Sequence, residues 1–129
     1  MKAKYKKIMI IDDNEIDNYI VKTLLKNNNI ADEVIVFDSA VAAIEYLQFN
    51  QNNVNELPQI IFLDLYMPIM NGFQFIEMLG KINSSAVQAS KLCVLSSSID
   101  NNDIIKSKFN KSVFTYIAKP ISTEFLLSL

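Results

Sequence analysis

The segment IIFLDLYMPIMNG, residues 60–72, decides the fold of this chain. Its first four residues are apolar without a polar interruption, which is typical of a strand buried on both faces of a parallel sheet. We therefore predict a strand over Gln59–Leu63. Asp64 follows directly, and the turn residues from Met67 to Gly72 then lead into a helix with apolar residues at helical spacing.

The same pattern of a short apolar strand and a following helix recurs on both sides of this segment. The further strands are predicted at Lys7–Ile11, Val34–Phe37, Leu92–Leu95 and Val113–Ile117, and the further helices at Glu15–Asn28, from Asp38 or Ser39 to Leu47, at Asp100–Phe109 and at Ser122–Leu129. Five such units with short connections predict an α/β fold in which helices cover both faces of a parallel sheet. The expected arrangement is a doubly wound, three-layer (βα)5 sandwich with strand order 2-1-3-4-5.

Length and composition indicate one ordinary globular domain. The chain has 129 residues, of which 50% are hydrophobic and 20% are charged, so residues 1–129 suit a single domain. The last predicted helix has only about two turns, which is short for a docked terminal helix. We expect either a small helix or, as we favour, the truncation of a longer one.

The charges, the single cysteine and the short apolar runs limit which partners and cellular locations the sequence allows. The net charge is -2 and the 12 basic residues are all lysines, so nucleic acid is not an expected partner. Cys93 lies in an apolar run and is expected to be a buried thiol. The apolar run Ile8–Ile11 is too short for a signal peptide, and no run can span a bilayer, so we expect a cytoplasmic protein without membrane contact.

Three acids stand at strand ends that this topology brings together. Asp12 and Asp13 follow the first predicted strand, and Asp64 follows the third. Like charges about 4 Å apart repel by about 4 kcal/mol at an effective dielectric constant of 20, so such a cluster requires a cation. Oxygen ligands favour Mg²⁺ or Mn²⁺. The simpler interpretation is that the first two acids only cap the following helix and that Asp64 only begins a turn.

Two further polar residues stand at neighbouring strand ends. Ser96 follows the fourth predicted strand, and Lys119 follows the fifth. Singly, they would be an ordinary strand-end serine and a solvated lysine. Together, a hydroxyl and a mobile ammonium suit a site that holds a phosphoryl group on the carboxylate of Asp64.

These residues carry a resemblance to a known family. The strings IIDDNE (10–15), FLDLYMPIMNG (62–72), VLSSS (94–98) and YIAKP (116–120) resemble the receiver domain of response regulators in two-component signalling, the CheY-like family. The resemblance extends from Lys7 to about Leu127. It implies a flavodoxin/CheY-like fold and a phosphorelay function.

The resemblance implies a role for each acid. Asp64 would be the phosphoacceptor, taking the phosphoryl group from a sensor histidine kinase or a histidine phosphotransfer protein. Asp13, Asp64 and the backbone carbonyl of Tyr66 would bind Mg²⁺, with Asp12 acting through water. Ser96 would contact the phosphoryl oxygens. The receiver would catalyse its own phosphorylation and dephosphorylation rather than turn over a separate substrate.

The resemblance also implies how a signal leaves the domain. Lys119 would contact the phosphoryl group, its bond to Pro120 would be cis, and Tyr116 would change rotamer with Ser96. The surface of the fourth helix, fifth strand and fifth helix would then change its affinity for a downstream protein. The chain would act as a monomer or a phosphorylation-dependent homodimer.

The sequence departs from the commonest family pattern, and other functions share the fold. Ser96 replaces a threonine, the bulky Tyr66 is expected to limit water entry, and Asn110–Ser112 lacks a Gly-Ala pair. A flavin binder would need a phosphate loop where Asp12 and its acidic neighbours stand. A haloacid-dehalogenase-type phosphatase would need a second acid where Asn14 stands. A pseudo-receiver that binds partners without phosphorylation is the main alternative.

Overall fold

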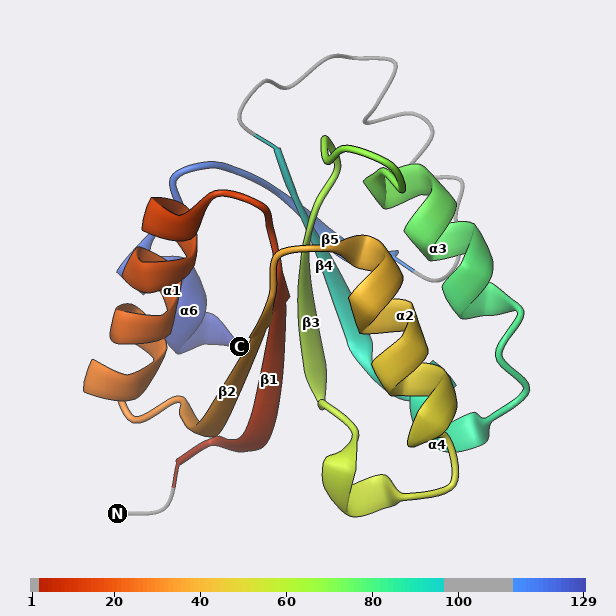
Figure 1. The fold of residues 1–129 in the computed structure, drawn as a ribbon. Coiled ribbons are helices and arrows are strands. Elements are labelled where there is room, and N and C mark those ends of the chain that lie inside the picture. Colours follow the sequence, from red (N-terminus) through yellow and green to blue (C-terminus); the bar gives the residue numbers. More distant parts are fainter. Residues whose placement is uncertain (1–2, 97–112) are drawn as a thin grey trace.

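The computed structural model describes residues 3–96 and 113–129. These residues form one parallel sheet of order β2-β1-β3-β4-β5, which confirms the predicted topology (Figure 1). Its strands are β1 (Tyr5–Ile11), β2 (Ala31–Phe37), β3 (Ile60–Asp64), β4 (Lys91–Ser96) and β5 (Val113–Ala118). The helices of the described residues are α1 (Glu15–Asn27), α2 (Ala40–Phe49), α3 (Gly72–Gly80), α4 (Ser85–Gln88) and α6 (Thr123–Ser128), with a short 3-10 helix η1 (Val54–Glu56).

The helices form a layer on each face of the sheet. Helices α1 and α6 lie on one face, and α2, α3 and α4 lie on the other (Figure 1). Successive residues of a strand point to opposite faces. In β1, Ile8 and Ile10 pack under α1, whereas Met9 and Ile11 pack under α2 and α3. Both faces of the sheet are therefore buried, which explains the continuous apolar strands, and Cys93 is buried as predicted.

Asparagine and serine side chains determine where two of the helices begin. The Asn14 side-chain oxygen accepts a hydrogen bond from the Asp17 backbone N–H at 3.0 Å, so Asn14 is the N-cap of α1. Ser39 caps α2 in the same way. The simpler interpretation of Asp12 and Asp13 as the cap of α1 is therefore wrong.

Some element bounds differ from the predicted ones. The predicted helix over Asp100–Phe109 lies outside the described residues. Helix α4 is an additional short helix that Ser84 caps. Strand β2 begins at Ala31 rather than Val34, because its first residues pair with the start of β1. Ser122 is the cap of α6 and therefore lies just outside that helix.

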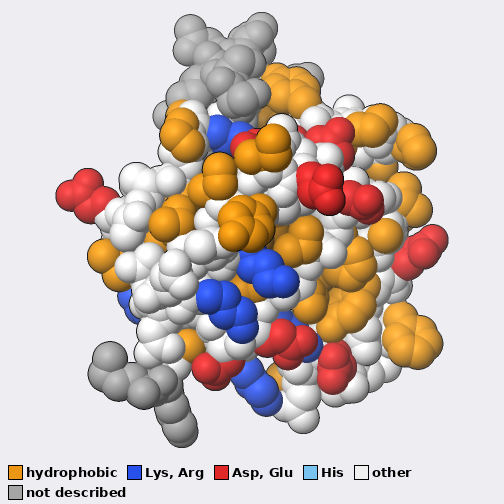
Figure 2. Space-filling model, turned by 60° about the vertical axis from the view of Figure 1, so that its left-hand side comes forward, with side chains coloured by type: hydrophobic (Ala, Val, Ile, Leu, Met, Phe, Trp, Pro, Cys, Tyr) orange, Lys and Arg blue, Asp and Glu red, His pale blue; other side chains and the backbone are white. Residues whose placement is uncertain are grey.

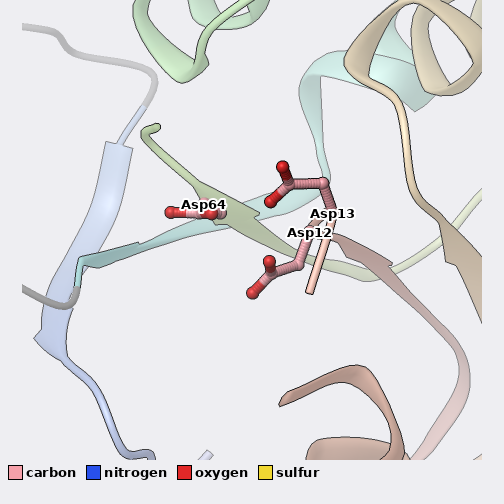
Figure 3. Close-up of side chains that lie close together, drawn as sticks. All are labelled: Asp12, Asp13 and Asp64. Carbon is pink, nitrogen blue, oxygen red and sulfur yellow. The ribbon is translucent and has the colours of Figure 1, made fainter. Parts of the chain in front are cut away.

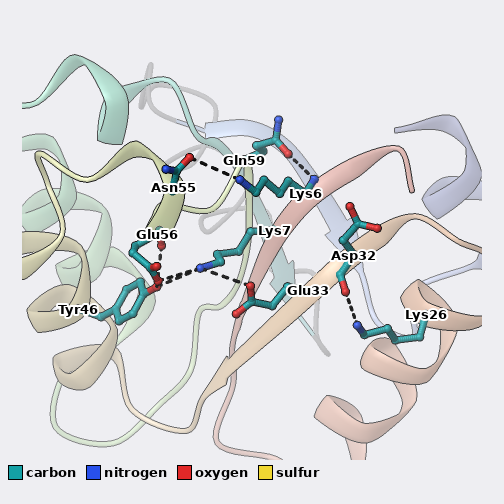
Figure 4. A network of polar contacts seen from close by, with 9 residues as sticks. All are labelled: Lys6, Lys7, Lys26, Asp32, Glu33, Tyr46, Asn55, Glu56 and Gln59. Atoms are coloured by element: carbon teal, nitrogen blue, oxygen red, sulfur yellow. Dashed lines mark hydrogen bonds and ion pairs between the residues drawn. The ribbon is translucent and has the colours of Figure 1, made fainter. Parts of the chain in front are cut away.

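A buried lysine joins several elements at the end of the sheet opposite the acids. Lys7 of β1 is 3% exposed. Its ammonium lies 3.1 Å from Glu56 of η1 and 3.6 Å from Glu33 of β2, and it donates to the hydroxyl of Tyr46 in α2 (Figure 4). The burial of this charge is compensated by paired oxygens, so the cluster has a structural explanation.

Candidate functional site

The structure brings the three predicted acids together. Strands β1 and β3 are adjacent, with Ile11 paired to Leu63, so the residues that follow them lie side by side. Figure 3 shows Asp12 and Asp13 at the end of β1 and Asp64 at the end of β3. One carboxylate oxygen from each of the three lies within 4.8 Å of the others. We call these three residues the acid cluster.

The three carboxylates differ in their exposure. Asp12 is 2% exposed and Asp64 is 7% exposed, whereas Asp13 lies at the surface. Burial and the negative charge of Asp12 together raise the pKa of Asp64 to about 7, although the charge of Lys119 lowers it. Near neutral pH, Asp64 is therefore partly protonated. A second positive charge beside it, in addition to Lys119, would favour the ionised carboxylate.

Lys119 supplies one positive charge, and it lies closest to Asp12. Its Nζ is 2.5 Å from Asp12 Oδ2, 3.1 Å from Asp17 Oδ2 and 3.8 Å from Asp64 Oδ2. Burial alone would lower the pKa of Lys119, but the hydrogen bond and charge of Asp12, with the charge of Asp64, raise it overall. The side chain is therefore a cation. The Lys119–Pro120 bond is cis, as the resemblance implied.

Two residues of α1 that no sequence motif marked complete this arrangement. Asp17 and Asn18 lie in the first turn of α1, after the cap residue Asn14. The Asn18 side-chain amide donates to the backbone carbonyl of Asp12 at 2.7 Å, and Asp12 Oδ1 accepts from the backbone N–H of Asn14 at 2.9 Å. These bonds tie the start of α1 to the end of β1 and fix the carboxylate of Asp12.

The turn after Asp64 is held by close backbone contacts. The backbone N–H of Tyr66 donates to Asp64 Oδ1 at 3.3 Å, and the N–H of Gly72 donates to the carbonyl of Leu65 at 2.8 Å. A Cβ on Gly72 would lie 2.6 Å from Leu65 Cα, so only glycine fits here. The Tyr66 side chain is 48% exposed at the rim of the site.

Ser96 and Tyr116 lie on the neighbouring strands. Asp64 pairs with Leu95 in the sheet, so Ser96 is the next residue along β4, and it is fully buried. Its carbonyl accepts from the backbone N–H of Lys119 at 2.9 Å. Tyr116 of β5 is half-buried and packs against the core under α2 and α3. The segments Ser97–Ser98 and Asn110–Ser112 lie outside the described residues.

The acid cluster fits a hard divalent cation. Its donors are carboxylate oxygens, which Mg²⁺ prefers, and the exposed Asp13 leaves one side accessible to water ligands. Burial and the charge of Asp12 both disfavour an ionised Asp64, and a bound divalent cation would offset these two effects. The arrangement can therefore hold a cation among three carboxylates, with the ammonium of Lys119 near two of them, Asp12 and Asp64.

No helix among residues 3–96 and 113–129 is long and apolar enough to cross a membrane.

Residues 8–129 match the family model of the response regulator receiver domain. Protein PilG of Pseudomonas aeruginosa is 31% identical over 121 residues, which make up 94% of this chain and 82% of PilG.

Solved structures agree with this match. A response regulator receiver protein from Dyadobacter fermentans has a TM-score of 0.83 at 31% identity, covering 95% of this chain and 93% of that one. A two-component response regulator from Cytophaga hutchinsonii has a TM-score of 0.87 at 28% identity, covering 97% of this chain and 93% of the other.

Proposed function

This chain belongs to the response regulator receiver family of two-component signalling, and from that premise we propose that it accepts a phosphoryl group on Asp64. The observation that carries the proposal is the acid cluster with Lys119 beside it. A carboxylate nucleophile, two further acids for a cation and an ammonium for the phosphoryl oxygens are the groups that phosphoryl transfer to aspartate requires.

In the proposed reaction, an ionised oxygen of Asp64 attacks the phosphorus of a phosphohistidine on a donor protein. The new P–O bond forms as the P–N bond breaks, and the electron pair of that bond stays on the imidazole nitrogen, which takes up a proton. Dephosphorylation follows when water attacks the phosphorus and the carboxylate of Asp64 leaves with its electron pair. Inorganic phosphate is then released.

The neighbouring residues position and neutralise the reacting groups. Lys119 is already within 3.8 Å of Asp64 Oδ2, so a small movement would bring its ammonium to a phosphoryl oxygen. Ser96 would donate its hydroxyl to another oxygen. Mg²⁺ or Mn²⁺, held by Asp13, Asp64 and the Tyr66 carbonyl, with Asp12 through water, would supply the remaining positive charge.

The partners follow from this chemistry. The donor would be a sensor histidine kinase or a histidine phosphotransfer protein, and a downstream protein would read the change at Ser96 and Tyr116. Figure 2 brings the α1 side forward and shows hydrophobic side chains among charged ones on this face. Ile16, Tyr19 and Ile20 of α1 are 72%, 71% and 47% exposed, and they offer an apolar surface near the acid cluster for a protein donor.

Intact mass measured after exposure to acetyl phosphate and Mg²⁺ tests the proposal. The wild type should gain one phosphate, and a chelator should prevent the gain. Asp64→Asn should gain none, whereas Asp38→Asn, which removes an exposed acid at the end of β2, should behave as the wild type does. A wild type that never gains phosphate would instead favour the pseudo-receiver, which binds partners without phosphorylation.

A further inference from the structure

Asp17 has no assigned role in the proposed reaction, yet it contacts the lysine of the site. We propose that Asp17 is a positioning residue that holds the ammonium of Lys119 on the α1 side of the crevice, and so withholds part of its charge from Asp64 and from a phosphoryl group attached there. This inference rests on the proposed function. It deepens that function by naming a residue of this chain that regulates the same site.

The distances show that the ammonium of Lys119 is shared unequally. Its Nζ lies 2.5 Å from Asp12 Oδ2 and 3.1 Å from Asp17 Oδ2, but 3.8 Å from Asp64 Oδ2. The lysine side chain is 15% exposed and the Asp17 side chain 38% exposed, so the pair is partly shielded from water. A contact that Lys119 makes with Asp17 has to be loosened before its ammonium can move fully toward a group on Asp64.

Asp17 is itself held firmly in place. Its backbone N–H donates to the side chain of the cap residue Asn14 at 3.0 Å. The next residue, Asn18, donates to the carbonyl of Asp12 at 2.7 Å and so fastens the first turn of α1 to β1. The backbone of Asp17 is therefore fixed, and its side chain extends from a defined position beside the crevice.

A simpler interpretation is that the carboxylate of Asp17 only interacts favourably with the positive end of the helix dipole, as acids in a first helical turn do. Glu15 lies in the same turn and would serve that purpose equally well. Among the ion pairs of the described residues, Lys119 pairs with Asp17 but not with Glu15. Glu15 is therefore a matched control, because its neutralisation removes the same charge without touching Lys119.

The space beside the pair allows the lysine to move. A cavity of about 250 Å³ is bordered by Asp12, Asp17 and Lys119 at its polar end and by apolar residues of α1 and the Pro120–Ile121 segment. Open space therefore lies beside the Lys119 ammonium between Asp12 and Asp17, whereas Asp64 does not line this cavity. Loss of Asp17 would shift the ammonium toward Asp12 and Asp64, which are its remaining partners.

This shift has opposite consequences for a cation and for a phosphoryl group. Lys119 on Asp12 and Asp64 competes with Mg²⁺ for those carboxylates, so the affinity for Mg²⁺ should fall. The same ammonium is then free to contact a phosphoryl mimic on Asp64, so the affinity for the mimic should rise. Each change should be roughly two- to fivefold, as expected for one partly exposed ion pair.

Two calorimetric titrations of the purified full chain test the proposal. The first measures Mg²⁺ binding alone, and the second measures beryllofluoride binding at saturating Mg²⁺. Asp17→Asn should bind Mg²⁺ more weakly and beryllofluoride more tightly than Glu15→Gln does. Asp17→Glu, which retains the charge, should restore the values of the wild type.

The outcomes separate this inference from the proposed function. If Asp17→Asn lowers the affinity for both ligands, the residue is merely structural. If its two affinities equal those of Glu15→Gln, only the net charge of the protein matters. Either result overturns the inference while wild-type binding of beryllofluoride still supports the proposed function. If the wild type binds no beryllofluoride, the proposed function fails and this inference fails with it.

Discussion

Replacing Asp64 with asparagine should stabilise the metal-free protein at neutral and alkaline pH. The pKa of Asp64 is about 7 in the fold, mainly because of burial and the charge of Asp12, against an ordinary value of 3.8. A carboxyl group whose pKa is higher in the folded state binds its proton more tightly there. The wild type therefore loses stability as the pH rises from about 4 through about 7, where the folded protein must give up that proton.

The pKa difference gives the size of this effect. About 3 pKa units correspond to about 4 kcal/mol at 1.36 kcal/mol per unit. The crevice is open on the side of Asp13, and its side chains can relax, so we expect a gain of about 2 kcal/mol for Asp64→Asn above pH 8. The gain should be less than half as large near pH 5, because the wild-type carboxyl is largely protonated there in the fold.

Urea unfolding followed by far-ultraviolet circular dichroism measures this difference, since the chain has no tryptophan to report by fluorescence. Both proteins are compared with a chelator present near pH 5 and near pH 8. Mg²⁺ should then stabilise the wild type more than Asp64→Asn, because the variant lacks one carboxylate ligand. Equal stability of the two proteins near pH 8, or a difference that does not change with pH, would refute the reasoning.

Three other substitutions have defined outcomes. Gly72→Ala should destabilise the fold by about 2–3 kcal/mol and weaken Mg²⁺ binding, because its Cβ would clash with Leu65. The control Gly80→Ala, which has open space around it, should unfold in urea as the wild type does. Tyr66→Ala should lose its phosphate faster in a phosphate-release assay, since water gains access, and an unchanged lifetime would contradict this. Lys7→Ala should lower the free energy of unfolding by about 1–3 kcal/mol without slowing phosphorylation, and a slowed rate would show that the Lys7 cluster is coupled to the site.

The fold was predictable because the strands are buried on both faces. Each continuous apolar run, such as the one ending at Leu63, marks a strand, and the intervening helical spacing requires parallel crossovers. The start of β2 was harder, because Asp32 and Glu33 interrupt the apolar pattern of an edge strand. Helix α4 has only four residues, too few for a periodic signal.

The acid cluster was predictable because acids at the ends of neighbouring strands must meet once the strand order is known. Asp17 was not, because its contact with Lys119 joins residues 102 positions apart. Its place one turn after the capping Asn14 was the only local signal. Which carboxylate Lys119 approaches most closely depends on side-chain geometry at the crevice, and residue types alone do not determine it.

The most direct measurement locates the phosphate on the chain. Protein treated with acetyl phosphate and Mg²⁺ is reduced with borohydride, which converts an aspartyl phosphate into homoserine, and its peptides are then sequenced by mass spectrometry. We predict homoserine at position 64 and unmodified Asp12 and Asp13. Homoserine at either of those two positions, or at none of the three in a protein that has gained phosphate, would contradict the assignment of Asp64 as the acceptor.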